Sequence, residues 1–503
     1  MKKLSYLSTV LFASFALLSC NDNEDSLNPP ASNPGPDLMV YGITSNNELV
    51  SFNASNPSSF TSKNTITGIG SGEKLMSVDF RPATGELYAV SSASKIYVIN
   101  TSSFSARAVS STAFSPSVSG SIISIDFNPT VDRIRLVSNT GQNLRINPET
   151  GVTAATDSNI NGSGMPSVTG IAYTNSKSGA SSTTLYDIDA ASGKLFKQDP
   201  PNNGTLVEVG SLGFTFTGQA AFDINPGNTA ALMAVQAGNQ NILYTLDLTS
   251  GKASNIGTLP QTVIDLAIPT DPVAYAVDNS NNLQIFNPNN PMPVSKSMTG
   301  MQSGESIVGI DFRPANGQLY AMGSSSRMYT VNLGTGTLTA VGSSAFSTQL
   351  SGTDFGFDFN PTVDRIRVVS NTGQNLRLNP NDGTISAVDL TINPGTPAVS
   401  AAAYTNNVAG ATATTLFVID HNTDKLYQQT PPNNGVLVET GSLGINISSA
   451  NGFDIGSMSQ KAYLMATVNG ATKIYTVNTT TGAATAVSDY PNSVKAFTIG
   501  LGF

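Results

Sequence analysis

The chain has 503 residues, with 24 Lys and Arg against 33 Asp and Glu, which gives a formal net charge of −9. A negatively charged chain without a basic cluster is not expected to bind nucleic acid. One cysteine (Cys20) and one histidine (His421, in a turn whose repeat carries Ala190) leave no residues for disulfides, cysteine-zinc sites or a duplicated Ser-His-Asp triad.

The first residues have the pattern of a bacterial lipoprotein signal. Lys2 and Lys3 precede the apolar run LSTVLFASFALL, which is too short to remain as a membrane-spanning helix. The following Ser19-Cys20 completes a sequence that resembles the lipobox, in which the cysteine becomes the first mature residue and carries the lipid. We therefore predict a signal peptide over 1–19 and lipidation at Cys20, with an ordinary signal peptide as the alternative. Several acyl chains would make the membrane a stable partner.

Residues 20–37 are predicted to be the lipidated cysteine and a disordered tether. The stretch NDNEDSLNPPASNPGPD has no apolar period and is rich in Pro, Asn and acidic residues. Acidic residues soon after the cysteine resemble export signals of surface lipoproteins. The predicted location is the cell envelope, lipid-anchored at the outer membrane, with periplasmic and surface-exposed placement both open.

The remainder of the chain is a tandem duplication. VDFRP at 78–82 returns as IDFRP at 310–314, and the 23-residue segment 126–148 returns at 358–380 with two aliphatic exchanges. PPNNG at 200–204 returns at 431–435. We place the two units at 38–270 and 271–503.

Each unit shows a finer repeat of four short strands. Residues 306–346, for example, contain IVGIDF, QLYAMG, RMYTVN and LTAVG, which alternate apolar and polar residues between turns rich in Gly, Asn and Ser. Four antiparallel strands in about 40–50 residues are typical of a β-propeller blade. Equivalent blades are expected to begin near residues 76, 122, 168, 219, 307, 354, 400 and 450.

The ends of each unit predict how a ring would close. Both units begin without an innermost strand, and both end with an unassigned inner-strand segment, VIDLAIP at 263–269 or KAFTIGLGF at 495–503. Pairing of the last strand with the first blade would remove an exposed sheet edge. The sequence therefore predicts an all-β fold of two tandem propellers with about five four-stranded blades each. A single ten-bladed propeller is the alternative.

The motif FDFNPTVDRIRVVSNTGQNLRLNP, followed by AYTN and an LYxID-like segment, resembles a bacterial family known as domain of unknown function number 4394. Two copies would cover nearly all of 38–503. The resemblance implies a propeller-like fold and an envelope location, and it implies no activity.

The 23-residue segment carries arginines where other blades carry packing residues. Arg135 takes the place of Tyr88, Tyr186 and Met233 in the second strand, and Arg145 takes the place of Tyr97 and Tyr244 in the third strand. Asp126 and Asp132 are close in sequence and are expected to pair with these guanidinium groups.

Two accounts of this segment are open. In one, a buried Arg–Asp network locks the blade to its neighbour. In the other, the arginine forks and nearby amides bind an anionic ligand such as a carboxylate, a phosphate or an acidic sugar. The candidate ligand-binding residues are Arg135, Arg145, Asn139 and Gln142, and their duplicates Arg367, Arg377, Asn371 and Gln374.

An aspartate recurs in the inner strands, which line the central channel of a propeller. These carboxylates could form a ring that binds Ca²⁺, or each could accept hydrogen bonds from backbone N–H groups of the adjoining blade. We assign no metal ligand and no cofactor, and keep Ca²⁺ as the alternative. The residues are Asp79, Asp126, Asp223, Asp265, Asp311, Asp358 and Asp454.

These features favour a monomeric envelope lipoprotein that acts as a ligand- or protein-binding propeller module without catalysis. Rigid blades, a tether and exposed loops suffice for binding. A structural envelope or matrix protein is the first alternative. A hydrolase that uses paired carboxylates or Ca²⁺ is the second.

Overall fold

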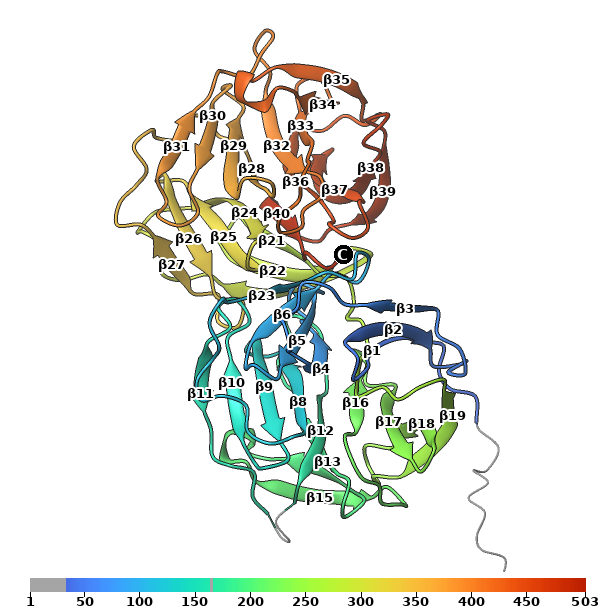
Figure 1. Ribbon diagram of the computed structural model, residues 1–503. Coiled ribbons are helices and arrows are strands. Elements are labelled where there is room, and N and C mark those ends of the chain that lie inside the picture. The colour runs from blue at the N-terminus through green and yellow to red at the C-terminus, as the bar shows by residue number, and fades with distance from the viewer. Residues whose placement is uncertain (1–32, 163–165) are drawn as a thin grey trace, which may run out of the picture.

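The computed structural model describes residues 33–162 and 166–503, so the predicted signal peptide, Cys20 and most of the tether lie outside the described residues. The described residues form 40 strands in ten four-stranded sheets (Figure 1). No described helix is long and apolar enough to cross a bilayer. The prediction of an all-β chain with tandem propeller-like units is confirmed.

The first half contributes five sheets, which form the blue to green part of Figure 1. Its elements are β1 (Met39–Ile43), β2 (Glu48–Asn53), β3 (Ser62–Thr65), β4 (Leu75–Phe80), β5 (Leu87–Ser91), β6 (Ile96–Ile99), β7 (Ala106–Ala108), β8 (Ile123–Asn128), β9 (Arg133–Ser138), β10 (Asn143–Ile146), β11 (Thr153–Thr156), β12 (Val168–Tyr173), β13 (Leu185–Asp189), β14 (Lys194–Gln198), the 3-10 helix η1 (Pro201–Asn203), β15 (Leu206–Ser211), β16 (Ala221–Ile224), β17 (Ala231–Ala237), β18 (Gln240–Leu246), β19 (Ala253–Leu259) and β20 (Asp265–Ala267).

The second half repeats this order in the yellow to red part. Its elements are β21 (Ala274–Asp278), β22 (Asn282–Asn287), β23 (Asn290–Ser297), β24 (Ile307–Arg313), β25 (Gln318–Gly323), β26 (Arg327–Val331), β27 (Leu338–Val341), β28 (Phe355–Asn360), β29 (Arg365–Ser370), β30 (Asn375–Leu378), β31 (Ile385–Val388), β32 (Val399–Tyr404), β33 (Leu416–Asp420), β34 (Lys425–Gln429), η2 (Pro432–Asn434), β35 (Leu437–Ser442), β36 (Ser449–Ile455), β37 (Ala462–Val468), β38 (Ala471–Val477), β39 (Ala484–Asp489) and β40 (Val494–Ile499).

The last strand of each half completes the first blade of the same half. β20 pairs with β1, with Gly42 opposite Leu266, and β40 pairs with β21, with Tyr275 opposite Thr498. β20 also contacts the inner strands β4 and β16, so the five inner strands of this half follow one another in a closed circle. β20 does not extend the β21 sheet, which excludes the ten-bladed alternative.

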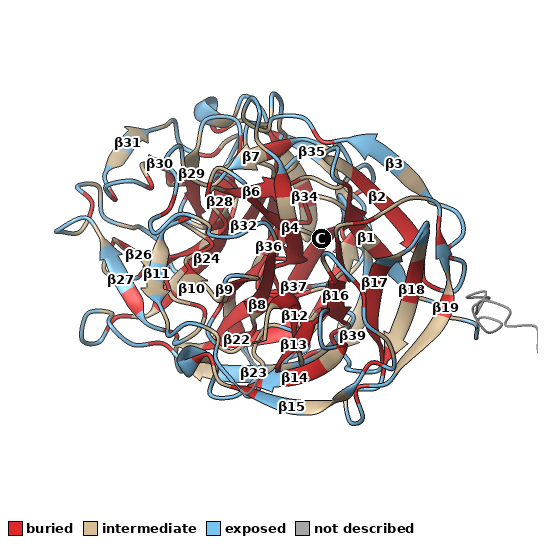
Figure 2. Cartoon of the chain, turned by 60° about the horizontal axis from the view of Figure 1, so that its bottom comes forward, coloured by how far each residue is buried: buried red, intermediate tan, exposed pale blue. Residues whose placement is uncertain are grey.

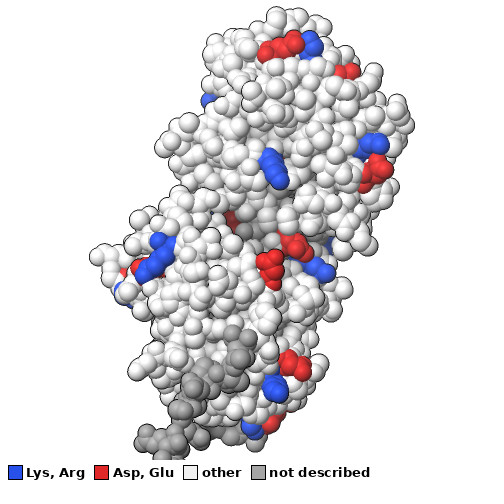
Figure 3. Space-filling view, turned by 90° about the vertical axis from the view of Figure 1, so that its right-hand side faces the viewer, with Lys and Arg blue, Asp and Glu red and all other residues white. Residues whose placement is uncertain are grey.

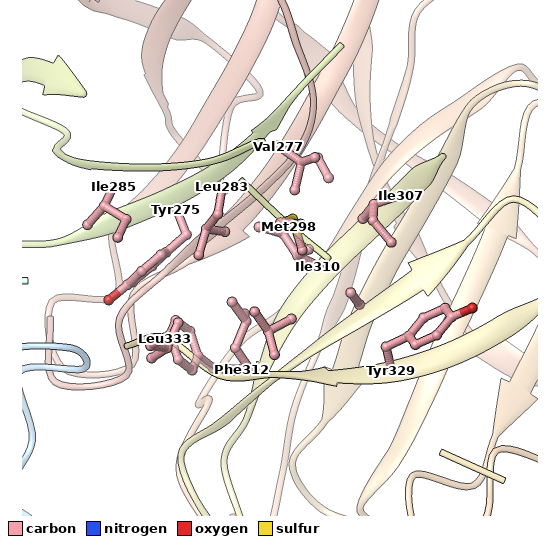
Figure 4. Packing of buried hydrophobic residues seen from close by; sticks show 14 of the residues in the cluster. Tyr275, Val277, Leu283, Ile285, Met298, Ile307, Ile310, Phe312, Tyr329 and Leu333 are labelled. Carbon is pink, nitrogen blue, oxygen red and sulfur yellow. The ribbon is translucent and has the colours of Figure 1, made fainter. Parts of the chain in front are cut away.

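Burial decreases from the inner to the outer strand of a blade, as the red inner strands and pale blue outer strands of Figure 2 show. The core lies between consecutive blades, because each sheet packs its faces against its neighbours. Figure 4 shows one such layer, to which β22 contributes Leu283, β24 contributes Phe312 and β26 contributes Tyr329. All three side chains are fully buried.

The two halves meet through the loop between β4 and β5. Its Arg81 donates from Nη1 to the carbonyl of Gly317 at 3.0 Å. The hydroxyl of Tyr275, which points out of the apolar cluster in Figure 4, donates to the carbonyl of Ala83 at 2.8 Å. The N–H of Gly502 donates to the carbonyl of Thr84 at 2.7 Å. The chain terminus of the second half thus lies against the first half.

Candidate functional site

The two arginines of the 23-residue segment lie opposite each other on β9 and β10 and share one carboxylate. Arg135 is 2% exposed, and its Nη1 donates to Oδ2 of Asp157 at 2.6 Å and to Oδ1 of Asn143 at 2.7 Å. Arg145 donates to both oxygens of Asp157 at 2.8 Å. Although burial opposes the change, hydrogen bonds from Arg145 and Arg135 hold the pKa of Asp157 below its usual range.

The PPNNG motif completes this network from the neighbouring blade. It forms η1 between β14 and β15. Asn202 accepts a hydrogen bond from Nη2 of Arg135 at 2.7 Å, and the carbonyl of Pro201 accepts one from Nδ2 of Asn143 at 3.0 Å. The two repeated motifs of the sequence therefore belong to one network that joins the β8–β11 blade to the β12–β15 blade.

The second half builds the same network. Arg367 donates to Asp389 at 2.6 Å and to Asn433 at 2.8 Å, and Arg377 donates to both oxygens of Asp389. A buried ion pair that loses one partner costs about 3–5 kcal/mol. This cost gives a physical reason why both copies keep the same polar residues, and it supports the structural account of the segment.

The structure does not bring the amides of the predicted site to the arginines. Oδ1 of Asn139 accepts the N–H of Ser121 at 3.1 Å, and Gln142 bonds the backbone of Ser117 and Ser119. Asn371 and Gln374 hold the equivalent loop in the second half. These four amides order the loop that precedes each inner strand β8 or β28. Binding of an anion by the predicted residues stays a prediction.

Two details of the sequence interpretation are wrong. Asp126 and Asp132 do not pair with Arg135. Asp126 lies among the inner strands at the centre of the ring, which we call the hub, and Asp132 pairs with Arg81. Sequence reasoning missed Asp157, although its repeat Asp389 follows at the same spacing of 232 residues as the 23-residue segment.

The third-strand alignment is correct for Tyr244, which faces Met233 across its ladder, but it is wrong by one residue for Tyr97. Arg145 faces Arg135 across the ladder as Val98 faces Tyr88, whereas Tyr97 faces Ala89 on the other side of its sheet. Neighbouring residues of a strand point to opposite faces, so a shift of one residue reverses the assignment.

Three inner-strand carboxylates converge at the centre of each half. One oxygen from each of Asp79, Asp126 and Asp223 lies within 4.8 Å of the others, and all three residues are buried. Asp79 accepts the N–H of Phe127 in the next blade at 2.7 Å, as the hydrogen-bonding account predicts. Burial, and next the charge of Asp223, raise the pKa of Asp79 well above its usual range.

The equivalent group in the second half is Asp311, Asp358 and Asp454. There the hydroxyl of Thr498 lies 2.9 Å from Oδ1 of Asp311 and 2.8 Å from Oδ2 of Asp454. These carboxylates could hold a cation or protons, and whether Ca²⁺ binds at either centre stays a prediction.

Asp265 does not belong to the same layer, which corrects its grouping with the other aspartates. It is hydrogen-bonded to the hydroxyl of Ser77 and accepts the N–H of Val78 at 3.0 Å. Ser77 in turn accepts the N–H of Ile125 at 2.8 Å. Asp265 and Ser77 thus belong to a separate layer of side chains, in which each side chain accepts an N–H of the next inner strand. We call it the serine layer.

A cleft of about 550 Å³ lies between the two halves, and Figure 3 shows a hollow there on a largely uncharged surface. No sequence pattern predicted it, because neither half contains it alone. The described residues that line it come from both halves and from the segment that connects them, and they include Tyr41, Glu86, Ser103, Arg107, Thr270, Asn407, Thr412, Met458 and Phe503.

Three residues of the lining carry a side-chain oxygen that is buried and has no hydrogen-bond partner among the described residues: Oε2 of Glu86, Oγ1 of Thr270 and Oδ1 of Asn407. Buried polar groups in proteins nearly always have a partner, so each such atom calls for an explanation. The other oxygen of Glu86 lies 3.6 Å from Arg107, which also donates to the carbonyl of Pro314 at 3.2 Å.

Comparison with known protein families gives a match in each half. The family model described as domain of unknown function (DUF4394) matches residues 48–267 and 282–500. Comparison with curated proteins finds none that matches the chain. With both halves matched over most of their length, the chain belongs to the DUF4394 family and carries two copies of its domain.

Proposed function

We propose that this protein is a binding module of the cell envelope that holds a small ligand in the cleft between its two propellers. The observation that carries the proposal is the cleft itself, whose volume of about 550 Å³ falls within the range of about 300–1,000 Å³ that is typical of ligand sites. Its lining combines apolar residues such as Tyr41 and Phe503 with polar ones such as Asn407 and Arg107, as such sites do.

The proposal includes a lipid anchor at Cys20 and a tether that presents a monomer at the outer membrane, on the periplasmic or the outer side. The lipobox-like Leu17-Leu18-Ser19-Cys20 and the Pro- and Asn-rich residues after it support this placement. Loss of palmitate labelling in Cys20→Ala is the expected result, and an unlabelled wild type would overturn the anchor.

The proposal contains no catalytic step and no cofactor. A glycosidase that uses carboxylates needs a pair of them around its substrate, and Glu86 is the one acidic residue among the described lining residues of the cleft. The aspartates that do lie together are buried in the hubs. A structural role in the envelope is the competing proposal, supported by the paired state of the arginines.

A thermal-shift screen of the purified full chain tests binding. The panel contains divalent cations, neutral and acidic oligosaccharides, peptidoglycan fragments and small carboxylates. A compound at 100 times its Kd should stabilise the protein by about 2.7 kcal/mol. We expect at least one hit, and silence across the panel would favour the structural role.

Variants that fill the cleft then locate the hit. Ser103 and Thr412 are exposed residues of the lining, so Ser103→Trp and Thr412→Trp should fold normally and abolish binding. Thr335→Trp is the matched control, because Thr335 occupies the same turn of the second half and is exposed. A hit that survives both cleft variants would place binding elsewhere. If Arg145→Ala with Arg377→Ala abolished that hit, the site would be the arginine patch.

A further inference from the structure

The first blade of the second half is covered by a turn of the first half. Tyr275 of β21 donates from its hydroxyl to the carbonyl of Ala83 at 2.8 Å, and the hydroxyl of Ser178 lies 2.7 Å from the Tyr275 hydroxyl. Ala83 belongs to the turn between β4 and β5 and is 3% exposed. It packs in the apolar cluster of Figure 4, to which Tyr275 also belongs. The protein thus already binds a small residue and its carbonyl at this position of one half.

The equivalent position of the first half is open. Tyr41 of β1 corresponds to Tyr275, since each pairs with the closing strand of its half and packs edge-on against a phenylalanine of the next blade. The repeat of Ala83 is Ala315, which is exposed. Tyr41 lines the cleft instead, and the described members of its apolar cluster all come from the first half. The cleft therefore lies where the second half binds a turn.

The cleft presents hydrogen-bond donors that a ligand can reach. The hydroxyl of Tyr41 has no partner among the described residues, and it does not belong to the unpartnered atoms that are buried, so it is accessible. Arg107 uses Nη2 for the carbonyl of Pro314, and the same reasoning applies to its Nε and Nη1. Arginine only donates hydrogen bonds. These groups require a ligand with acceptor oxygens, such as carbonyl groups.

The charge of the cleft and its apolar lining favour neutral carbonyl groups over a free carboxylate. Glu86 lies 3.6 Å from Arg107, so the guanidinium charge already has a counterion. A carboxylate would lose hydration without finding an unpaired positive charge, which is costly in a partly buried site. Met458 and Phe503 add half-buried apolar surface on which a side chain can pack.

We infer that the cleft binds a turn of a polypeptide in which a small residue presents its backbone carbonyl to Tyr41. The inference rests on the proposed function, because it names the ligand class of the same cleft. The hydroxyl of Tyr41 donates to this carbonyl as Tyr275 donates to that of Ala83, and Arg107 donates to a second carbonyl. The contact between Tyr275 and the Ala83 turn is the observation that selects a peptide among ligands with carbonyl oxygens.

The test uses the purified full chain and titration calorimetry. The peptide probe is cyclic RPATGE, the sequence of the turn at 81–86, and its control is the same ring with Asp in place of Ala. Maltopentaose represents sugars, and glutarate represents small carboxylates. We expect saturable binding of the RPATGE ring and binding about tenfold weaker for the Asp ring, because a charged side chain would be desolvated against the tyrosine. Maltopentaose and glutarate should not bind.

Two matched variants separate recognition from a structural role. Tyr41→Phe removes an accessible donor, so the Kd of the RPATGE ring should rise about fivefold while the Tm of the free protein stays unchanged. Tyr275→Phe removes the equivalent hydroxyl from a contact that is already made, so it should lower the Tm and leave the Kd unchanged. Ser103→Trp should abolish binding, and Thr335→Trp should leave it unchanged.

Two results with these variants would overturn the inference. An unchanged Kd in Tyr41→Phe would mean that the hydroxyl does not recognise the peptide. Binding that is kept in Tyr41→Phe and lost in Tyr275→Phe would mean that the peptide displaces the turn of Ala83 from the second half.

The outcomes also separate the two proposals. If maltopentaose, glutarate or a compound of the thermal-shift panel binds, the peptide does not bind, and Ser103→Trp abolishes the binding, the cleft is a binding site and the peptide class is wrong. If the peptide is the only ligand found and binds equally well to Ser103→Trp, both proposals fail. Failure of every compound to bind the wild type also overturns both.

Discussion

The β8–β11 blade and its duplicate make the same polar contacts, whereas the two hubs are filled differently. In the first hub, Ser77, Ser124 and Asp265 link successive inner strands, and Gln219 donates to the carbonyls of Met76 and Ile123. The second half carries Gly309, Gly356 and Ala496 in place of the two serines and Asp265, and it carries Ala450 in place of Gln219.

The difference shows which parts of a blade tolerate change. In the arginine network, the charge of one buried arginine is shared among an aspartate and two asparagines, one of which belongs to a loop of the neighbouring blade. A change of any single member would therefore leave a buried group unpaired. In the hub, each side chain of the serine layer satisfies one N–H of the next strand. Such a local contact can be lost while the ladder hydrogen bonds of the blade persist.

A second contrast lies on β13. Asp187 is fully buried, and neither carboxylate oxygen has a partner among the described residues. Burial raises the pKa of Asp187 well above its usual range, and the nearby charge of Arg135 opposes this shift. The second half carries Val418 at this position, fully buried. One half therefore keeps a costly group that the other replaces with an apolar one.

The largest expected loss of stability comes from breaking the arginine network, which both halves contain. Arg135→Ala and Arg367→Ala should each lower the free energy of unfolding by about 3–5 kcal/mol, because each removes one partner of a buried pair. Equilibrium denaturation in urea measures both variants. Arg145→Ala is the control, with a loss of at most about 1 kcal/mol, because its side chain is 34% exposed. An unchanged stability in Arg135→Ala would favour the ligand-binding account.

A smaller effect, in this case a gain of stability, should follow when the buried residue on β13 is replaced by the residue that the second half carries there. Asp187→Val copies Val418 and should stabilise the protein by about 1–3 kcal/mol at pH 8, because it removes an unpartnered buried polar group. The gain should shrink near pH 4, where the carboxyl is protonated and its charge no longer needs to be desolvated. Urea denaturation at the two pH values measures this. A loss of stability would mean that Asp187 has a partner or a function.

A further test concerns the pH dependence of the hubs. Burial raises the pKa of Asp223 to about 7 and that of Asp265 to about 8 in the first half, and that of Asp454 to about 6 in the second. Because the unfolded value is about 3.9, these groups stabilise the fold most below about pH 4. Their contribution is lost as the pH rises through the folded values.

Thermal denaturation between about pH 4 and pH 8 measures this slope. Asp265→Ser should flatten its upper part, because Asp265 has the highest of the three values. The same titration in saturating CaCl₂ tests the calcium alternative, since a bound cation would favour the charged carboxylates and reverse the slope. A flat profile in the wild type would mean that the hub aspartates are not protonated in the folded protein.

The sequence by itself determined the strands, their grouping into fours and the closure of each ring. Alternation of apolar and polar residues and the repeat of motifs such as VDFRP and IDFRP are local properties, so they can be read along the chain. It also indicated which segment carries the arginines. It could not assign Asp157 or Asn202 to them, because those partners lie on other strands and are brought together by the packing of two blades.

Only the tertiary structure decided which groups meet at the centre of each ring and where the halves touch. Asp265 and Asp223 look equivalent in sequence, but the register of β20 against β1 places them in different layers. The cleft depends on the contact of the first half with the second, and the repeats of Glu86 and Asn407 are Gln318 and Ser176. A site formed once between two copies leaves no repeated pattern, because each copy contributes different residues to it.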